Sequence, residues 1–383
     1  MADFQPLFSP ANSKRVGVPN VVDIEGVLDG IRTALTANQL TNNGPRIQEF
    51  EAKIAEYLGT AEFVTVNNAT NGLMAVAKAL DLGVDPRKRK IIVPSFTFCA
   101  TVNAMVWMQL EPVFCDIDPV NYQLDPAAVR RLISPEVCAI LGVHVYGIAG
   151  DLRALEAIAE EAQIPLFFDA AHAFGCSYGG KKIGHWGRCE VFSFHATKAF
   201  NTFEGGGIAT NDRALAQRLR KLNNFGFVGY DNIGDIGINS KMSEINAIQG
   251  LVMLRHYSDI IAHNKRNYLA YRTALAGAKE LKLLDHPDDS NYHYMVIETA
   301  TAELRDRLAK QMAKHNVILR KYFYPGVHRM EPYRLAYPEC DLPVTDRVSN
   351  CALCLPSGLH VSATEADSIG FLLVSIATVQ NLD

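Results

Sequence analysis

The feature that most constrains the fold of this chain is a regular alternation of short apolar runs with longer stretches of helical periodicity. Runs that are apolar throughout indicate strands buried on both faces, which is typical of a parallel sheet covered by helices. The sequence therefore predicts an α/β fold with a mainly parallel sheet. The apolar runs are residues 63–66, 91–94, 112–116, 138–145, 164–169 and 189–193.

Several of the intervening stretches carry helix boundaries. Pro45 begins one such stretch and Gly59 ends it, as expected for the first helical position and the residue after the last. Asp151 can cap a second helix, which has one apolar stripe made of Leu152, Leu155, Ile158, Ala159 and Ala162. The same periodicity predicts helices over residues 73–80 and from about residue 242 to 257.

The length of 383 residues predicts two or three domains, since a domain usually has roughly 150 residues. An Asp-rich segment at residues 284–290 breaks the alternation. We predict a large unit, with the N-terminal segment, over residues 1–259. A smaller α/β unit is predicted over residues 260–383.

Charge and hydropathy exclude several classes of protein. The net charge of −4 is not gathered into blocks of either sign, so no nucleic-acid partner is expected. No run reaches the roughly 18 apolar residues of a spanning helix, and the N-terminal residues lack a signal-peptide pattern. The eight cysteines are scattered, which favours reduced thiols. We expect a cytoplasmic protein with no membrane partner.

Reactive side chains follow two of the apolar runs, and ligands of parallel sheets bind at the carboxyl ends of strands. Asp169-Ala-Ala-His172 ends one run, and Ser193-Phe-His-Ala-Thr-Lys198 ends another. A desolvated lysine can form a Schiff base with an aldehyde, and a buried aspartate can pair with the ring nitrogen of pyridoxal phosphate. Residues 68–72 lie between a strand and a helix, where N–H groups bind phosphate. Together these residues predict a pyridoxal phosphate site.

Other interpretations of the same residues stay open. Lys198 and Asp169, taken singly, are also typical of a solvated surface and of a turn. Asp169 with His172, or Cys351 with Cys354, could begin a metal site, although neither pair has further ligands nearby, and we predict no metal. Residues 205–207 are not part of a phosphate-binding P-loop, and no G-x-G-x-x-G follows a strand, which disfavours a nicotinamide cofactor.

From about Leu40 onward the chain resembles the DegT-type nucleotide-sugar aminotransferases, which are pyridoxal-phosphate enzymes. The resemblance implies the fold type I of pyridoxal-phosphate transferases: a mainly parallel seven-stranded sheet flanked by helices, with a smaller C-terminal α/β domain. It also implies a homodimer with shared active sites. The matching motifs are Leu40-Thr-Asn-Asn-Gly-Pro45, Asn67-Asn-Ala-Thr70, Pro94-Ser-Phe-Thr-Phe98, His144-Val-Tyr-Gly147, Asp169-Ala-Ala-His172, Ser193-Phe-His-Ala-Thr-Lys198, Glu204-Gly-Gly206, Gly237-Ile-Asn-Ser-Lys-Met242 and Leu342-Pro-Val-Thr345.

The resemblance implies roles for three residues around the cofactor ring and the reacting atoms. Lys198 would carry the cofactor as a Schiff base and act as acid and base. Asp169 would face the pyridine nitrogen, and His172 would lie beside the phenolic oxygen. Lys198 also distinguishes the chain from relatives that have histidine there and act as dehydratases.

The remaining cofactor contacts implied by the resemblance surround the ring face and the phosphate. Phe98 would stack on the ring; a core phenylalanine is the alternative. The phosphate would be held by Thr70, the amide of Ala69, Ser193 and, from the neighbouring subunit, Asn239. The chain departs from the common Ser-Gly-Thr of the family at Asn68-Ala-Thr70 but keeps the threonine.

Within the family, the chain is most similar to enzymes acting on carbon 4 of dTDP-4-keto-6-deoxyglucose. The implied product is dTDP-4-amino-4,6-dideoxyglucose, with glutamate as amino donor, for surface polysaccharide such as the O-antigen of lipopolysaccharide. Tyr324 and His328 are the candidate sugar-facing residues. The alternatives are a 3-keto or other nucleotide-linked sugar, a non-enzymatic ligand sensor on the same fold and, more remotely, a metal-dependent hydrolase.

Overall fold

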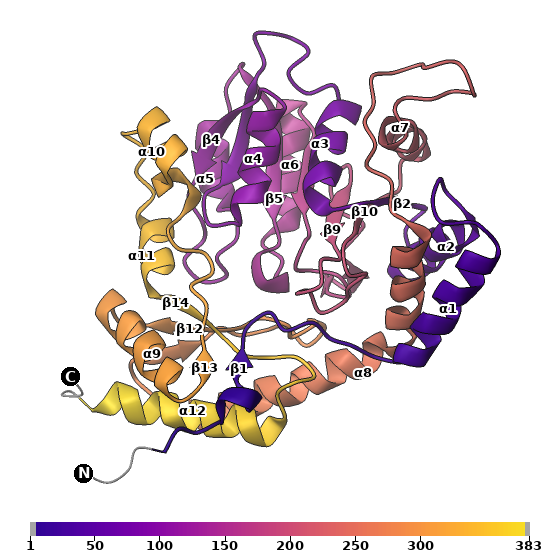
Figure 1. Cartoon of the computed structure of the whole chain (residues 1–383). Helices are drawn as coiled ribbons and strands as arrows, with labels where there is room; N and C mark the ends of the chain where they lie inside the picture. The colour runs from indigo at the N-terminus through magenta and orange to yellow at the C-terminus, as the bar shows by residue number, and fades with distance from the viewer. Residues whose placement is uncertain (1–4, 380–383) are drawn as a thin grey trace.

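A seven-stranded sheet forms the centre of the large unit in the computed structural model, which describes residues 5–379 (Figure 1). The strand order is β2-β10-β9-β6-β5-β3-β4, and all pairings except those of β10 are parallel. All six predicted runs form strands of this sheet. The strands are β2 (Glu62–Val66), β3 (Lys90–Pro94), β4 (Glu111–Cys115), β5 (Val137–Val143), β6 (Leu166–Asp169), β9 (Glu190–Ser193) and β10 (Gly206–Thr210).

The strand β10 was not among the predicted runs, because its glycines conceal the strand pattern. It runs antiparallel between β2 and β9. A Cβ atom at Gly207 would lie 2.1 Å from the Phe63 ring, and one at Gly206 would lie 2.5 Å from the Phe192 carbonyl oxygen. These positions need glycine because neighbouring strands fill the space of a side chain.

Helices cover both faces of the sheet and enclose two apolar cores. Helices α2, α5 and α6 pack on one face, and α3, α4 and α7 on the other. The predicted caps are confirmed: Asp151 accepts the Ala154 N–H at 3.0 Å, and Gly59 ends α2 with a φ of 76°. These helices are α2 (Pro45–Leu58), α3 (Ala69–Ala79), α4 (Cys99–Trp107), α5 (Pro126–Leu132), α6 (Leu152–Ala162) and α7 (Arg213–Asn223).

A small unit, built on a three-stranded antiparallel sheet, lies below the large one in Figure 1. None of the helices over residues 5–379 is long and apolar enough to cross a membrane. The strands of this sheet are β11 (Leu281–Leu283), β12 (Met295–Thr299) and β14 (Ala352–Leu355). The helices of the unit are α9 (Ala302–Lys314), α11 (Pro343–Cys351) and α12 (Ala363–Thr378). Helix α10 (Glu331–Ala336) packs instead on the large unit, where Tyr333 joins the core that includes α3 and α4.

The two units share the helix α8 (Glu244–Ala274), which has 31 residues. Its contacts reach α1 (Ile24–Thr36) and α2 as well as α12. The predicted boundary at residues 259 and 260 therefore falls inside a continuous helix rather than in a linker. In the N-terminal segment, β1 (Lys14–Arg15) pairs in parallel with β13 (Val317–Ile318) of the small unit.

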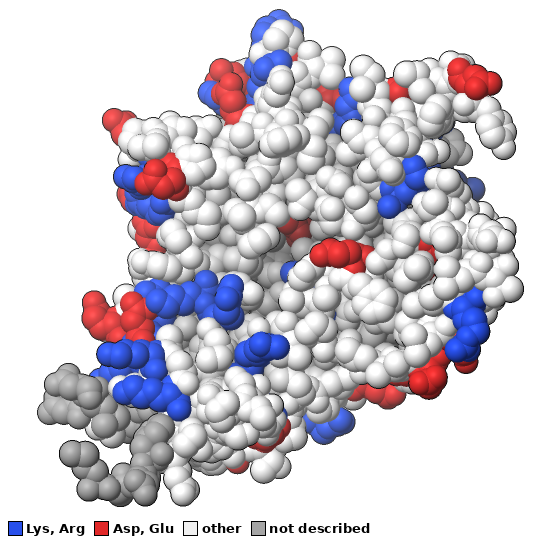
Figure 2. Space-filling model, in the orientation of Figure 1, with Lys and Arg blue, Asp and Glu red and all other residues white. Residues whose placement is uncertain are grey.

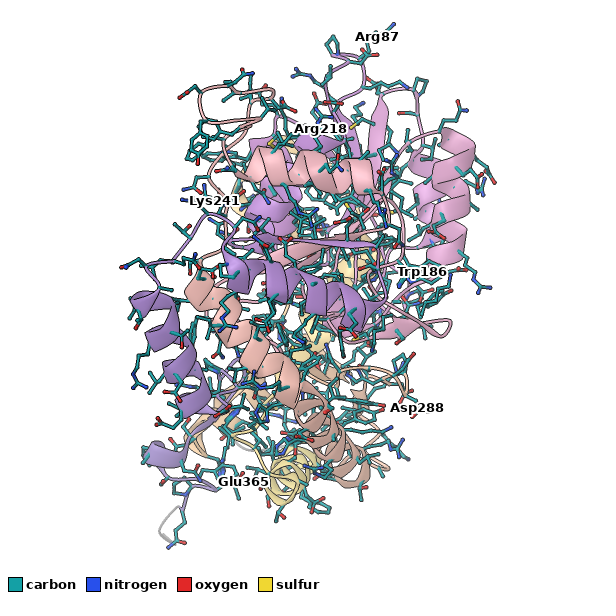
Figure 3. The ribbon with its side chains drawn as sticks, turned by 90° about the vertical axis from the view of Figure 1, so that its right-hand side faces the viewer. Arg87, Trp186, Arg218, Lys241, Asp288 and Glu365 are labelled. Atoms are coloured by element: carbon teal, nitrogen blue, oxygen red, sulfur yellow. The ribbon has the colours of Figure 1, made fainter. Side chains whose placement is uncertain are left out.

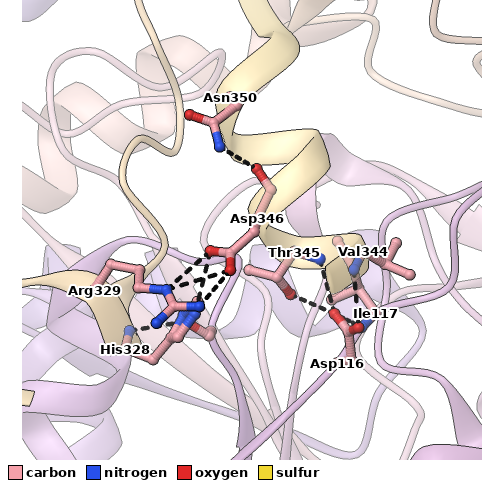
Figure 4. Close-up of polar contacts among 9 residues, drawn as sticks. Asp116, Ile117, His328, Arg329, Val344, Thr345, Asp346 and Asn350 are labelled. Carbon is pink, nitrogen blue, oxygen red and sulfur yellow. Dashed lines mark hydrogen bonds and ion pairs between the residues drawn. The ribbon is translucent and has the colours of Figure 1, made fainter. Parts of the chain in front are cut away.

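A half-buried carboxylate contact further ties the units together (Figure 4). Asp116, which follows β4, accepts the N–H groups of Val344 and Thr345 at 3.0 and 2.8 Å and the Thr345 hydroxyl at 2.7 Å. It thereby satisfies the first N–H groups of α11, which no carbonyl within the helix can reach. The matching motif at residues 342–345 thus has a structural role as a helix start.

Candidate active site

A cavity of about 440 Å³ opens between the two units, at the carboxyl ends of β5, β6 and β9. Figure 2 shows it as a hollow near the middle of the molecule. This is the position at which parallel sheets bind ligands. Seven of the predicted site residues line it, namely Ala69, Thr70, Phe98, Asp169, His172, Ser193 and Lys198.

Lys198 lies on the segment that follows β9, with its amine enclosed by the protein. Burial lowers the pKa of Lys198 to about 8, and the charge of Asp169 opposes part of that shift. The amine donates a hydrogen bond of 3.3 Å to the hydroxyl of Tyr294. A lysine with this pKa has a large neutral fraction near pH 8 and is therefore a competent nucleophile.

Asp169 ends β6 and is held in one orientation by two donors. The Thr101 hydroxyl donates to one carboxylate oxygen at 2.7 Å, and the Ala171 N–H donates to the other at 3.0 Å. Burial raises the pKa of Asp169, while these donors and the charge of Lys198 act in the opposite direction. A fixed, buried carboxylate of this kind can pair with a protonated ring nitrogen.

His172 is fixed as a neutral imidazole with a known tautomer. The backbone N–H of Tyr146 donates to its Nδ1 at 3.1 Å, and burial lowers the pKa of His172 well below its ordinary value. With Nδ1 accepting, the proton lies on Nε2. His172 can therefore donate one hydrogen bond from Nε2 without carrying charge.

The start of α3 provides the anion-binding wall of the cavity. Asn68 caps this helix by accepting the Asn71 N–H at 2.9 Å. The helix begins at Ala69, whereas the sequence predicted a start at residue 73. The first N–H groups of a helix bind anions, and the Thr70 and Ser193 hydroxyls line the same cavity. A Cβ atom at Gly206 would lie 3.0 Å from the Ala69 nitrogen, so glycine keeps this wall open. This donor set fits a phosphate group.

Phe98 caps α4 and stays 57% exposed although it is a large aromatic residue. It is thus not a core phenylalanine. Its ring lies 6.3 Å from that of Phe323, which also lines the cavity. Stacking of Phe98 on a cofactor ring stays a prediction.

The structure does not bring Tyr324, His328 or Asn239 into this cavity. His328 is buried, 2.6 Å from the Ser95 hydroxyl and 3.3 Å from the Asp346 carboxylate, beside Arg329 (Figure 4). The centre of the Tyr324 ring lies 4.4 Å from the guanidinium of Arg305 and 5.5 Å from the amine of Lys321. The backbone of Asn239 pairs with that of Asn224, at the base of an exposed loop over residues 224–239.

The sequence interpretation missed the contribution of the small unit to the cavity. Tyr294, Arg320, Tyr322 and Phe323 line it from that side, and Thr101 positions Asp169. Two tyrosine-rich segments, at residues 292–294 and 322–324, were the available signal. The rule that ligands bind at the carboxyl ends of parallel strands does not point to these segments, because they lie outside the strands, in the small unit.

The two metal-site alternatives gain no support from the described residues. Within residues 5–379, no group of three or more His, Cys, Asp and Glu side chains could hold a metal ion. Cys351 and Cys354 are both free thiols, and burial raises the pKa of Cys354 to about 12.

A mainly parallel sheet that presents a buried lysine, a buried aspartate and a phosphate-binding helix start defines a pyridoxal-phosphate type of aminotransferase fold. The model of the DegT/DnrJ/EryC1/StrS aminotransferase family matches residues 23–373, and the chain belongs to this family. It is a nucleotide-sugar aminotransferase.

Similar proteins cover nearly the whole chain. A dTDP-4-amino-4,6-dideoxy-D-glucose transaminase of Shigella dysenteriae is 32% identical over 366 residues, which are 94% of this chain and 98% of that enzyme. The Escherichia coli enzyme of the same name is 34% identical over 326 residues, which are 83% of this chain and 86% of that enzyme. The structure of DesI in the presence of its TDP-sugar product has a TM-score of 0.91 and 38% identity, covering 98% of this chain and 95% of that one.

Proposed function

We propose that this enzyme transfers the amino group of glutamate to carbon 4 of dTDP-4-keto-6-deoxyglucose, forming dTDP-4-amino-4,6-dideoxyglucose. The observation that carries the proposal is the convergence of Lys198, Asp169 and the start of α3 on one cavity. The names of two relatives that cover most of the chain support the choice of sugar. The proposed setting is the cytoplasm, where the product would serve surface polysaccharides such as the O-antigen of lipopolysaccharide.

The cofactor proposed for the cavity is pyridoxal 5'-phosphate, and the residues present fit its parts. Asp169 would hold the ring nitrogen, and the Nε2–H of His172 would donate to the phenolic oxygen. The phosphate would lie at the Ala69 and Thr70 end of α3 with Ser193. When bound, the cofactor supplies an electron sink for cleavage of the bond to the α-hydrogen of the amino acid.

Lys198 would move the protons of the reaction. In the first half-reaction its neutral amine would take the α-proton of glutamate; the amino group is retained in the site, and water supplies the carbonyl oxygen of the 2-oxoglutarate that leaves. In the second it would deliver a proton to carbon 4 of the sugar, which receives the retained amino group while its carbonyl oxygen leaves as water. The lowered pKa suits both directions, because neither the neutral nor the protonated amine is rare near pH 8.

A second copy of the chain is proposed to complete the site. The loop over residues 224–239 and helix α1 lie on one side of the molecule (Figure 1) and expose large apolar residues, including Phe227, Tyr230, Ile24 and Leu28. Arg218 anchors this loop through ion pairs with Asp81 and Asp235 (Figure 3). A homodimer formed through this side would bring Asn239 toward the phosphate of the partner subunit.

Product analysis tests the substrate. The purified enzyme is incubated with dTDP-4-keto-6-deoxyglucose and glutamate, and NMR locates the new amine on the sugar ring. Amination at carbon 4 is expected. Turnover of the 3-keto isomer alone would show that the substrate proposed here is wrong while leaving the aminotransferase assignment intact.

Borohydride reduction tests the cofactor site independently of turnover. After reduction, peptide mapping should find the pyridoxyl group on Lys198. The variant Lys198→Ala should bind the cofactor without being labelled and without turnover. Labelling of another lysine in the wild-type enzyme would remove Lys198 from its role.

A further inference from the structure

Arg320 introduces a second cation into the cavity, from the small unit. Of the described residues that line the cavity, only Lys198 and Arg320 are lysine or arginine. The Arg320 side chain is exposed, and its guanidinium lies 5.3 Å from the centre of the Tyr322 ring. No ion pair within residues 5–379 neutralises it. Figure 2 shows basic side chains beside the hollow on the side of the small unit.

The backbone holds Arg320 in a fixed place. Its N–H donates to the Cys354 carbonyl oxygen at 3.2 Å, and its own carbonyl oxygen accepts the Cys354 N–H at 2.8 Å. Cys354 belongs to β14, in the small sheet. The unpaired cation therefore projects from an ordered element, which favours a binding role over that of a freely moving surface side chain.

A row of two aromatic rings separates this cation from the reacting amine. The Lys198 amine is 5.8 Å from the centre of the Tyr294 ring, and the Tyr294 and Tyr322 rings are 6.4 Å apart. Tyr322 then contacts Arg320. Because Arg320 is exposed whereas the Lys198 amine is enclosed by the protein, the guanidinium lies nearer to solvent than the reacting amine.

This position distinguishes between the anions of the two substrates. The α-carboxylate of glutamate is attached to the reacting carbon and must bind close to Lys198. In the 4-keto sugar the diphosphate is on carbon 1, across the ring from the reacting carbon. We propose that Arg320 binds the diphosphate of the nucleotide sugar, an assignment that rests on the proposed function. An arginine suits this role because its guanidinium can form two parallel hydrogen bonds to phosphate oxygens.

Calorimetric binding of dTDP to the purified enzyme tests the assignment without requiring turnover. The Kd for dTDP should rise about tenfold to a hundredfold in Arg320→Ala, as expected for one charge-assisted contact, and less in Arg320→Lys. Arg87→Ala is the matched control, because Arg87 lies on an exposed loop at the end of the molecule opposite Glu365 (Figure 3) and should bind like wild type. Equal melting temperatures would show that each variant is folded.

Steady-state kinetics separate the two substrates. In Arg320→Ala, the KM for the nucleotide sugar should rise while the KM for glutamate stays the same. Unchanged dTDP binding in this variant, or a rise in the glutamate KM alone, would overturn the role of Arg320 and leave the proposed function standing. Failure of the wild-type enzyme to bind dTDP would instead overturn the proposed function, and the inference with it.

Discussion

The amine of Lys198, on the large unit, donates a hydrogen bond of 3.3 Å to the hydroxyl of Tyr294, which lies on the small unit. The Tyr294 ring also lies 4.2 Å from the ring of His172. One tyrosine thus contacts the residue proposed to move protons and the residue proposed to bind the phenolic oxygen. The small unit thereby contributes directly to the orientation of Lys198.

Replacing Tyr294 with phenylalanine should slow turnover without unfolding the enzyme. The protonated amine of Lys198 loses an acceptor, so the pKa of Lys198 should fall further, and kcat should decrease about tenfold, the effect of one hydrogen bond to a charged group. The pH profile of kcat reports the change in pKa, and Tyr57→Phe on α2 is the control. An unchanged profile would show that the contact does not influence Lys198.

The lowered pKa of Lys198 predicts how the apoenzyme reacts with pyridoxal phosphate at different pH. Only the neutral amine reacts, so the rate should rise up to about pH 8 and then level off. An ordinary lysine would keep gaining reactivity to about pH 10. Asp169→Asn should move the plateau to lower pH, since the Asp169 charge raises the pKa of Lys198. Stopped-flow absorbance measures the rate, and a rise continuing to pH 10 would contradict the burial argument.

Replacing Asn239 with alanine should weaken cofactor retention if the active unit is a dimer. Loss of one hydrogen bond to phosphate should raise the Kd for pyridoxal phosphate about tenfold. Asn232→Ala, a change in the same exposed loop, is the control. Light scattering should show a dimer for both variants. A monomeric wild-type enzyme that keeps its cofactor would exclude the shared site.

Replacing Asp116 with alanine should destabilise the contact between the units. Three hydrogen bonds to residues at the start of α11 are lost, and the free energy of unfolding should fall by about 2 kcal/mol. Urea denaturation measures it. Asp125→Ala, which removes a local cap that accepts the Ala127 N–H, should cost less. Equal losses would show that the contact between the units adds nothing beyond an ordinary helix cap.

The sheet and its reactive edge were predictable because both are encoded locally. Apolar runs mark the parallel strands; Asp169 ends one of them, and Lys198 lies on the segment that follows another. The strand β10 was concealed, since Gly207 is required by the packing of Phe63 and Gly206 by the close approach of the Phe192 carbonyl oxygen, and neither by the backbone conformation of the strand itself.

The other wall of the cavity was not predictable in the same way. Tyr294 and Arg320 reach the cavity only because the small sheet packs beneath the large one, and no local pattern encodes that packing. His328 shows the converse: its motif suggested a site residue, yet Ser95 and Asp346 hold its side chain away from the cavity.

The N-terminal segment matters for any redesign or tagging of this enzyme. Asn20 is buried; its side chain donates to the Ala199 carbonyl oxygen at 3.0 Å and accepts the Leu359 N–H at 3.0 Å. Its carbonyl oxygen accepts a hydrogen bond from the Asn201 side chain at 3.0 Å. Shortening the chain past Asn20, or inserting a fusion partner beside it, would loosen the peptide that carries Lys198, so a truncation chosen to aid expression would act as an active-site mutation.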